Sequence, residues 1–343
     1  MNLGGAIHLN RTGFLIICGI SCLLLFYVIS NRSNATTHNS LKDAPQVDLK
    51  KLLGVAIRAA KNGGIEVVSV KDKLTVQSKG KTKEGLNDVV TTADFQSHCA
   101  MKATIKHHFP NVVVVSEEAK AECKDENELD YSFGKEDEFK SLPPSLVYEK
   151  DITVWIDPLD ATKEYTEKLY HYVTTMVCVA VNGRPIMGII YKPFSNESFW
   201  SWVGNGQSNS IKSILIPADE EADGEIQEED DTELKVIVSK SHSGKIKENL
   251  QKNMKRISIT EAAGSGFKVL EVVAGKADVY VHNTAIKKWD ICAGDAILES
   301  LDGKLTTSDN FLIDYSDTFN VVNYNGIIAS MHKPSHNKFI GKL

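Results

Sequence analysis

The sequence has no excess of positive charge, no zinc-type cysteine pair and no visible internal repeat. Its 343 residues carry 39 lysines and arginines against 45 aspartates and glutamates, a formal net charge of −6. A chain with this balance does not attract polyanions through its overall charge, which argues against a nucleic-acid partner. Because no Cys-x-x-Cys pair occurs, a structural zinc site is not expected either.

Cysteine is too sparse and scattered for a framework of disulfides, with six residues in the whole chain. Two of them fall in an apolar run near the N-terminus. Cys178 lies in an apolar strand pattern and Cys292 in an expected helix, so we expect both to be buried thiols that pack as small hydrophobic side chains. Cys99 and Cys123 could pair, and the sequence leaves that question open.

Long hydrophobic runs are absent except for one. Residues 13–30 are 18 consecutive uncharged residues, close to the minimum for a membrane-spanning helix. The run exceeds the ~7–15-residue core of a signal peptide, so we expect an uncleaved anchor. Ser33 and Ala35 offer a cleavage site for the alternative, a removed signal peptide. In both cases the rest of the chain would enter the secretory lumen.

The anchor predicts four segments: a cytoplasmic tail (1–12), a transmembrane helix (13–30), a lumenal stalk (31–46) and a globular domain (47–343). The globular domain is long enough to bury a sizeable core. Three N-glycosylation sequons are compatible with the lumenal side, at Asn31, Asn34 and Asn196.

Strand and helix patterns mix along the globular domain. Apolar spacing predicts a helix from Asp48 to the glycines at 63–64 and another from Asp94 to about His108. The β-branched run at 111–116 predicts a buried strand, and the Asn-Gly pair at 182–183 predicts a hairpin. A mixture with an antiparallel meander predicts an α/β fold of layered sheets.

Three polar stretches interrupt these patterns. Residues 71–86 are lysine-rich and are expected to form a loop, and residues 120–150 read as a charged surface insertion. Residues 218–233 hold ten acidic side chains and no basic one. A cation-binding or partner-binding segment is one interpretation of that run, but a solvated surface loop is favoured.

Two carboxylates close to each other follow the apolar strand at 154–156. Asp157 and Asp160 stand three residues apart with Pro158 between them, and they would repel each other unless a cation or proton lay between them. The restrained backbone could aim both side chains and the Leu159 carbonyl at one point. Hard oxygens gathered in this way suit Mg²⁺ better than zinc.

Further acidic residues occupy the ends of other expected elements. Glu117 follows the strand at 111–116, while Asp94 and Asp290 begin helices, where an N-cap is the ordinary role. Such ends are where open α/β folds place their sites. The Thr162 hydroxyl could bond Asp94, and the Gly-Ser-Gly at 264–266 before a helix could cradle a phosphate.

Four sequence blocks carry a resemblance to the inositol monophosphatase superfamily, in the family's order: 88–94, 116–118, 155–162 and 288–294. The D-P-x-D-x-T block with a downstream W-D is the specific part, and the likeness spans about residues 48–330. The resemblance implies a layered αβαβα sandwich with mixed and antiparallel sheets.

Within the superfamily the chain is most similar to the bisphosphate nucleotidases, and among these to Golgi-resident phosphatases of adenosine 3′,5′-bisphosphate (PAP). The anchor, the segment 161–165 and the segment 239–244 carry this likeness, with Ala161 at a position where most relatives have glycine. The resemblance implies Mg²⁺-dependent hydrolysis of the 3′-phosphate of PAP to AMP and phosphate, which would clear a by-product of sulfotransfer. It also implies a single-pass type II protein of the Golgi membrane and sensitivity to lithium.

The resemblance assigns roles to individual residues. Two or three Mg²⁺ ions would be held by Glu117, Asp157, Asp160, Asp290 and the carbonyl of Leu159. Asp94 and Thr162 resemble the catalytic pair that activates water. Ser239 and His242 resemble contacts to the 5′-phosphate end of the nucleotide. Asp160 is also expected to meet the substrate, and the helix start after Gly264 adds Ser265 and the nearby Lys268 as candidate phosphate contacts.

Two other functions stay open. An inositol-phosphate phosphatase shares the same acidic set, although the segment 239–244 argues against it. A catalytically inactive, membrane-tethered scaffold is the non-enzymatic alternative, but it has no physical need for so many mutually repelling carboxylates. The sequence also leaves a homodimer open.

Overall fold

The computed structural model describes residues 23–27, 44–81, 87–123, 129–132, 141–215, 233–240 and 245–343. The chain divides into two units, Met1–Gln46 and Val47–Leu343. In the first unit residues 23–27 are helical, and the rest of the expected tail and membrane helix lies outside the described residues. Among the residues described here, no helix has the length and apolar content needed to span a bilayer.

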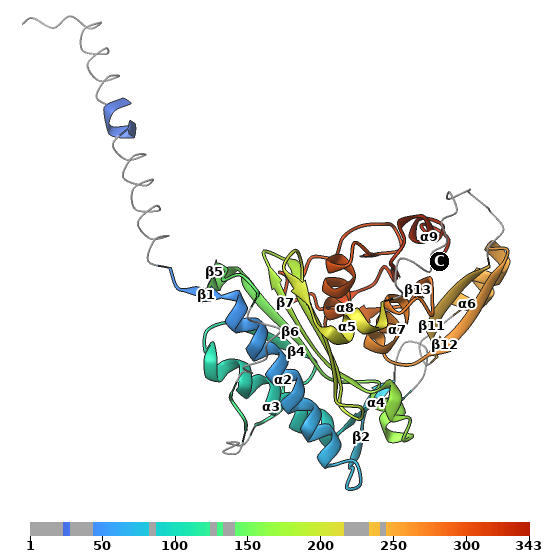
Figure 1. Cartoon of the computed structure of the whole chain (residues 1–343), viewed down its shortest axis with the longest axis horizontal. Helices are drawn as coiled ribbons and strands as arrows, with labels where there is room; N and C mark the ends of the chain where they lie inside the picture. The colour runs from blue at the N-terminus through green and yellow to red at the C-terminus, as the bar shows by residue number, and fades with distance from the viewer. Residues whose placement is uncertain are drawn as a thin grey trace, which may run out of the picture. The chain divides into compact units, whose positions relative to one another are not determined.

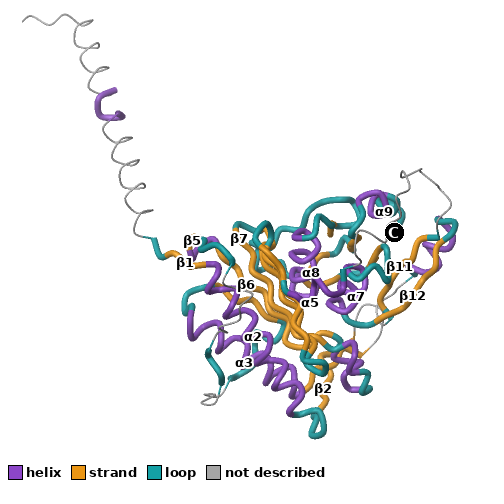
Figure 2. Tube along the Cα trace, in the orientation of Figure 1, coloured by secondary structure: helices purple, strands orange, loops and turns teal. Residues whose placement is uncertain are grey.

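Two sheets form the frame of the second unit (Figure 2). The larger sheet has the order β10-β9-β8-β7-β6-β4 and the bounds Gly206–Gln207, Glu197–Trp202, Arg184–Lys192, Thr174–Val181, Ile152–Asp160 and Val113–Ser116. The smaller sheet has the order β12-β11-β13-β17-β15 and the bounds Ile257–Ala262, Leu234–Ser239, Val279–His282, Ile327–Ser330 and Lys304–Thr306. Both sheets are mixed, because β4–β6, β11–β12 and β11–β13 are parallel and the other pairs are antiparallel.

Helices cover both faces of these sheets. Helices α2 (Leu49–Ser69) and α3 (Thr92–His108) pack on one face of the larger sheet, as Figure 1 shows. Helices α7 (Ser265–Val273) and α8 (Lys288–Ser300) lie between the two sheets and contact both, and the short α5 (Asn209–Ile214) packs on β9. The helices α6 (Ile246–Asn253) and α9 (Lys333–Asn337) adjoin the smaller sheet from its other side. These five layers confirm the expected αβαβα sandwich.

Short elements complete the unit. They are β1 (Gln46–Asp48), β5 (Leu146–Tyr148), the hairpin of β2 (Val76–Lys81) with β3 (Asn87–Thr91), α4 (Thr162–Thr166), and the pair β14 (Ile286–Lys287) with β16 (Val322–Asn323). The described parts of the insertion at 120–150 contain β5, the start of a 3-10 helix (Glu149–Asp151) and loops. The acidic run lies outside the described residues except for Glu233.

Helix α2 does not stop at the glycines where the sequence predicted its end. It continues to Ser69, because the glycines are needed for close packing rather than for termination. A Cβ at Gly63 would lie 2.6 Å from Met101 of α3, and one at Gly64 would lie 2.4 Å from Tyr191 of β8. The local cost of glycine in a helix, roughly 1 kcal/mol each, is therefore offset by contacts that only glycine permits.

Two further expectations were wrong. Part of the stretch at 71–86 forms β2, which pairs with β3 instead of looping out. Cys178 and Cys292 are not free thiols but form a disulfide. The apolar surroundings that suggested buried thiols are present, yet the two side chains face each other across the interface of β7 and α8. Cys99 and Cys123, which the sequence left open, form a second disulfide.

Candidate active site

The site begins where β6 leaves the sheet. The register of β6 with β7 shifts between Asp157 and Asp160, so the Asp-Pro-Leu-Asp stretch departs from regular pairing. Asp157 is 1% exposed, and its Oδ1 accepts a hydrogen bond from the Leu159 N–H at 3.2 Å. Because β4 runs parallel to β6 with Ser116 opposite Ile156, Glu117 follows at the same edge of the sheet as Asp157.

The N-terminus of α3 holds this turn from a second side. Asp94 Oδ2 accepts the N–H and the hydroxyl of Thr91, both at 2.7 Å, in a capping box that fixes the carboxylate. The Thr162 hydroxyl lies 3.0 Å from Asp94 Oδ1 and 3.0 Å from the Leu159 carbonyl. The Ser97 hydroxyl donates to the Pro158 carbonyl at 2.6 Å. The structure thus brings Asp94 and Thr162 into contact, and the hydrogen bond that the sequence suggested between them is present.

The first turns of α7 and α8 close the third side. Asp160 Oδ2 accepts the Gly266 N–H of α7 at 2.8 Å. The Ser265 hydroxyl donates to the Asp290 carbonyl at 2.6 Å, which ties the two helix starts together. Asp290 Oδ2 accepts the Lys287 N–H at 3.0 Å. Asp290 is therefore an N-terminal capping residue of α8, and it also stands within electrostatic range of Glu117 and Asp160.

Burial and the charges of neighbouring carboxylates disfavour the ionised forms of Asp157, Glu117 and Asp290. Burial, together with the charges of the other cluster carboxylates, holds the pKa of Asp157 well above its usual range, and the same causes raise the pKa of Asp290. Burial raises the pKa of Glu117 to about 7. Burial also raises the pKa of Asp94 to about 6, although hydrogen bonds from Thr91 and Thr162 act in the opposite direction.

Sequence reasoning missed a lysine that contacts this cluster. Lys79 of β2 places its Nζ 3.0 Å from Glu117 Oε1 and also pairs with Glu118. Burial acts to lower the pKa of Lys79, but the two glutamates outweigh it and raise the pKa. Nothing in the sequence indicated that β2 pairs with β3, because a lysine-rich stretch without clear alternation of polar and apolar residues predicts a loop.

The donor set suits a hard divalent cation. Among the residues that the structure describes, no three Asp, Glu, His or Cys side chains are already placed to hold a metal ion. The oxygens of Glu117, Asp160 and Asp290 accept hydrogens from protein donors. The groups are nevertheless hard oxygen ligands on elements that end at the same edge of the larger sheet or are hydrogen-bonded to it. Burial and the charges of neighbouring carboxylates raise the pKa values of Glu117, Asp157 and Asp290, and a bound cation would relieve that charge. The residues therefore fit Mg²⁺.

The expected substrate contacts are only partly brought together. Ser239 ends β11 opposite Ala262 of β12, which places it on the sheet edge that leads into α7. Lys268 is buried, and its ammonium donates to the Gly264 carbonyl. Burial lowers the pKa of Lys268 to about 8, against the attraction of Asp160. The Gly266 N–H that could cradle a phosphate is taken by Asp160, and His242 lies outside the described residues.

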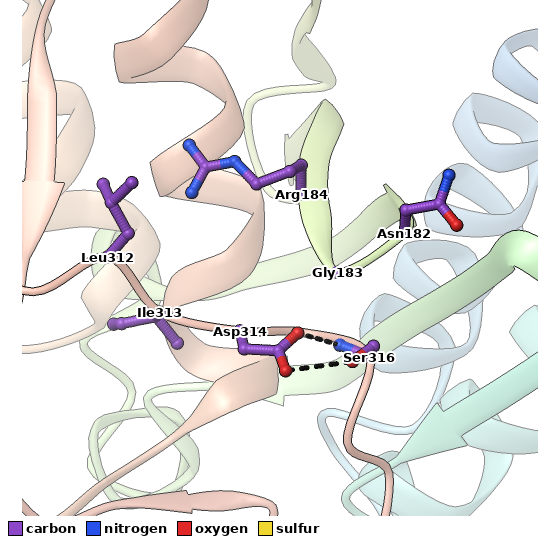
Figure 3. A pocket seen from close by; sticks show the side chains of 7 residues that line it. All are labelled: Asn182, Gly183, Arg184, Leu312, Ile313, Asp314 and Ser316. Atoms are coloured by element: carbon purple, nitrogen blue, oxygen red, sulfur yellow. Dashed lines mark hydrogen bonds between the residues drawn. The ribbon is translucent and has the colours of Figure 1, made fainter.

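A pocket at the opposite end of β7 is separate from the carboxylates. It is lined by the hairpin turn at Asn182–Arg184 and by Leu312, Ile313, Asp314 and Ser316 (Figure 3). Asp314 faces this pocket and accepts the N–H and the hydroxyl of Ser316, at 2.8 and 3.0 Å. It contributes no group to the acidic site.

Comparisons with known proteins agree with the sequence blocks. The sequence model of the inositol monophosphatase family matches residues 48–343. The chain is 41% identical over 349 residues to "Putative inositol monophosphatase 3" of Drosophila pseudoobscura pseudoobscura, covering 99% of this chain and 95% of that protein. It is 40% identical over 312 residues to the "Golgi-resident adenosine 3',5'-bisphosphate 3'-phosphatase" of Mus musculus, covering 88% of this chain and 83% of that protein.

Solved structures share the fold. CysQ from Bacteroides thetaiotaomicron, described as a bacterial member of the inositol monophosphatase family, aligns with a TM-score of 0.56 at 22% identity, covering 81% of this chain and 97% of that one. The extragenic suppressor protein suhB from Bartonella henselae aligns with a TM-score of 0.59 at 18% identity, covering 84% and 97%. On the family match and the relatives at about 40% identity, the chain belongs to the inositol monophosphatase family.

Proposed function

We propose that this phosphatase-family chain is a Mg²⁺-dependent enzyme that removes the 3′-phosphate of PAP to give AMP and phosphate. The observation that carries the proposal is the placement of the carboxylates: Asp157 is buried at the end of β6, Glu117 follows the parallel β4 at the same sheet edge, and hydrogen bonds join Asp160 and Asp290 to the start of α7. Burial, together with the charges of the neighbouring carboxylates, raises the pKa of Asp157. Such a cluster is unfavourable alone and is stabilised by divalent cations, which also offset the charge of a phosphate.

The ligands in this proposal are Glu117, Asp157, Asp160, Asp290 and the carbonyl of Leu159. Bound Mg²⁺ would supply positive charge to the phosphate oxygens and would make an attacking water more acidic. The fold supports the assignment by holding these groups on separate elements, β4, β6 and α8, whose ends meet.

Asp94 and Thr162 handle the proton in this proposal. The Thr162 hydroxyl has one hydrogen and two acceptors at 3.0 Å, Asp94 Oδ1 and the Leu159 carbonyl. With that hydrogen directed to Asp94, the lone pairs of Oγ1 are free to accept a hydrogen from water, and a proton can pass on to Asp94. A pKa of about 6 for Asp94 leaves it mostly ionised near neutral pH, which suits a base.

We also propose the Golgi lumen as the compartment, with residues 13–30 as the anchor of a type II protein. Two disulfides occur among the described residues, and disulfides persist in oxidising compartments rather than in the cytosol. Asn196, a predicted glycan acceptor, is exposed at the turn between β8 and β9. The relative from mouse is named for Golgi residence.

The second candidate is an inositol monophosphate as substrate, because several relatives at 38–41% identity bear the name inositol monophosphatase 3. The two substrates share the phosphomonoester and differ in the group that carries it. PAP is favoured over an inositol phosphate by the segment that resembles a nucleotide contact, which begins with Ser239 and Lys240.

The deciding experiment measures phosphate release from PAP and from inositol 1-phosphate by the full chain, with and without Mg²⁺ and with added lithium. We expect Mg²⁺-dependent release from PAP, faster than from inositol 1-phosphate and inhibited by lithium. Preference for inositol 1-phosphate would replace the substrate, and no release from any phosphomonoester would leave the inactive scaffold.

A further inference from the structure

The Cys178–Cys292 disulfide joins the middle of the larger sheet to the helix that carries Asp290. Cys178 lies on β7 and Cys292 on α8, with Cα atoms 5.6 Å apart and 114 residues of sequence between them. Both side chains are buried, at 1% and 0% exposure. The bond therefore lies inside the protein, between two elements that are distant in the chain.

One end of this bond lies two residues from Asp290, and the other lies two residues from the cross-strand partner of Asp157. Cys292 follows Asp290 by two residues on α8. On β7, Cys178 is two residues beyond Met176, and Met176 is the cross-strand partner of Asp157. Residues two apart on a strand, and residues directly opposite across two strands, share a face of the sheet. Asp157 therefore emerges on the same face that the disulfide attaches to α8.

A close backbone contact lies beside the disulfide. Gly188 of β8 is the cross-strand partner of Cys178, and Ala293 of α8 follows Cys292. A Cβ at Gly188 would come within 2.1 Å of the Ala293 carbonyl oxygen, so the helix backbone lies directly on the sheet here. The disulfide and this contact together fix both the distance of α8 from the sheet and its position along β7 and β8.

A force opposes this placement at the start of the helix. Cation binding requires Asp290 and Asp157 in their ionised forms, in which they repel one another, and α8 carries Asp290 in its first turn. The Ser265 hydroxyl bonded to the Asp290 carbonyl resists displacement, but one hydrogen bond contributes only about 1 kcal/mol net. A covalent link two residues away resists it much more strongly.

We propose that the Cys178–Cys292 disulfide is a positioning bond that holds Asp290 beside Asp157 and so sets the affinity of the site for divalent cations. The inference rests on the proposed function, because it takes these two carboxylates as cation ligands. Its consequence is that a chain made under reducing conditions folds but binds Mg²⁺ weakly.

The test is calorimetric titration of Mg²⁺ into the full chain, a readout that does not depend on turnover. The variant Cys178→Ala/Cys292→Ala removes the bond without leaving an odd thiol. We expect its dissociation constant for Mg²⁺ to rise about 10-fold or more, as when groups that orient metal ligands are removed. Titrations are run well below the unfolding temperature of every variant.

The matched control is Cys99→Ala/Cys123→Ala, which removes the disulfide between α3 and a surface loop. We expect its affinity to stay at the wild-type value. A second variant, Cys178→Val/Cys292→Ala, also removes the bond but fills more of the space that the sulfurs leave, and it should weaken Mg²⁺ binding as well. This variant carries the test if the double alanine variant does not fold.

The outcomes separate the two proposals. If wild type binds no Mg²⁺, the proposed function fails. If wild type binds Mg²⁺ and either Cys178→Ala/Cys292→Ala or Cys178→Val/Cys292→Ala binds it equally well, only the positioning role is overturned. An equal loss in the Cys99→Ala/Cys123→Ala control would also overturn it, because the effect would then belong to disulfides in general.

Discussion

The hydroxyl of Thr162 lies 3.0 Å from Asp94 Oδ1, although 68 residues separate the two in the chain. The other oxygen of Asp94 is already occupied by Thr91, so the carboxylate has one fixed orientation and one oxygen left for Thr162. Thr162 opens α4, and Asp94 belongs to the first turn of α3. The hydrogen bond between Thr162 and Asp94, which joins the first turns of α4 and α3, is therefore where the proposed proton transfer can be tested.

We predict that Thr162→Ala lowers kcat for phosphate release by about 100-fold or more, because positioned proton transfer contributes on that order. The KM should change little, since the hydroxyl is directed at Asp94 rather than at a substrate group. Thr162→Ser keeps a hydroxyl and should retain most of the activity. Steady-state kinetics on the two variants make the comparison, and near-normal kcat in Thr162→Ala would remove Thr162 from the mechanism.

Asp157→Asn tests the charge of the cluster. Burial and neighbouring carboxylates raise the pKa of Asp157, so its ionised form destabilises the cation-free protein as pH rises above its unfolded pKa. We predict that the cation-free variant is more stable than wild type at pH 8 and has no turnover.

Thermal unfolding with and without Mg²⁺ measures this effect. At 100 times its dissociation constant, Mg²⁺ should stabilise wild type by about 2.7 kcal/mol, and it should not stabilise Asp157→Asn. The exposed Asp314→Asn, away from the cluster, should behave as wild type. A Mg²⁺ response in Asp157→Asn equal to that of wild type would exclude Asp157 as a ligand.

The sequence predicted the parts of the site that depend on local order. Asp157 and Asp160 follow an apolar strand, and Asp94 begins a helix, so their positions at element ends could be read from neighbouring residues. The Asn-Gly hairpin was found for the same reason, because its turn chemistry is local. Layered α/β sheets followed from the mixture of these patterns.

The features that the sequence did not predict depend on contacts between elements that are distant in the chain. Lys79 reaches Glu117 only because β2 folds back along β3, and no pattern within 71–86 specifies that pairing. The same apolar spacing suits a buried thiol and a half-cystine, so only the packing of α8 on β7 distinguishes them for Cys178 and Cys292. Gly63 in α2 likewise predicts a helix end from sequence alone, and only its packing against Met101 explains why glycine is needed inside the helix.

Ala161 is held in a conformation that glycine adopts more easily. Its φ of 68° and ψ of 44° lie in the left-handed region, where an L residue pays roughly 1–2 kcal/mol. We predict that Ala161→Gly raises the free energy of unfolding by about 1 kcal/mol, since part of the relief is lost to the greater freedom of glycine in the unfolded chain.

Urea unfolding measures this change. Ala103→Gly, in the ordinary helical backbone of α3, is the matched control and should lower stability by about 1 kcal/mol. A loss of stability in both variants would show that Ala161 is not strained.

Asp295 gives a pH dependence that is independent of the cluster. It lies on α8, and its Oδ2 accepts the Tyr315 hydroxyl at 2.9 Å. Burial raises the pKa of Asp295 to about 7, against the hydrogen bond from Tyr315 and the charge of Arg184, while Glu299 adds repulsion. The folded protein therefore keeps this proton at pH values where the unfolded chain has lost it.

The direction of the change in stability with pH follows from the difference between the folded and unfolded pKa values of Asp295. For a carboxyl whose folded pKa exceeds its unfolded value, the stabilising contribution is complete below about pH 4 and is lost as pH rises through about 7. Asp295→Asn keeps an acceptor for Tyr315 but cannot ionise. We predict that the variant matches wild type near pH 4 and exceeds it at pH 8, by at most about 4 kcal/mol for a shift of roughly three pKa units.

The measurement is urea unfolding of both proteins at several pH values without added cation. Taking the difference between the two proteins cancels every contribution to the pH dependence that the two proteins share. A difference that is flat from pH 4 to pH 8 would show that Asp295 ionises as freely in the folded protein as in the unfolded chain. A difference that grows between pH 5 and pH 7 would locate the titration at this side chain, since the substitution changes nothing else that ionises.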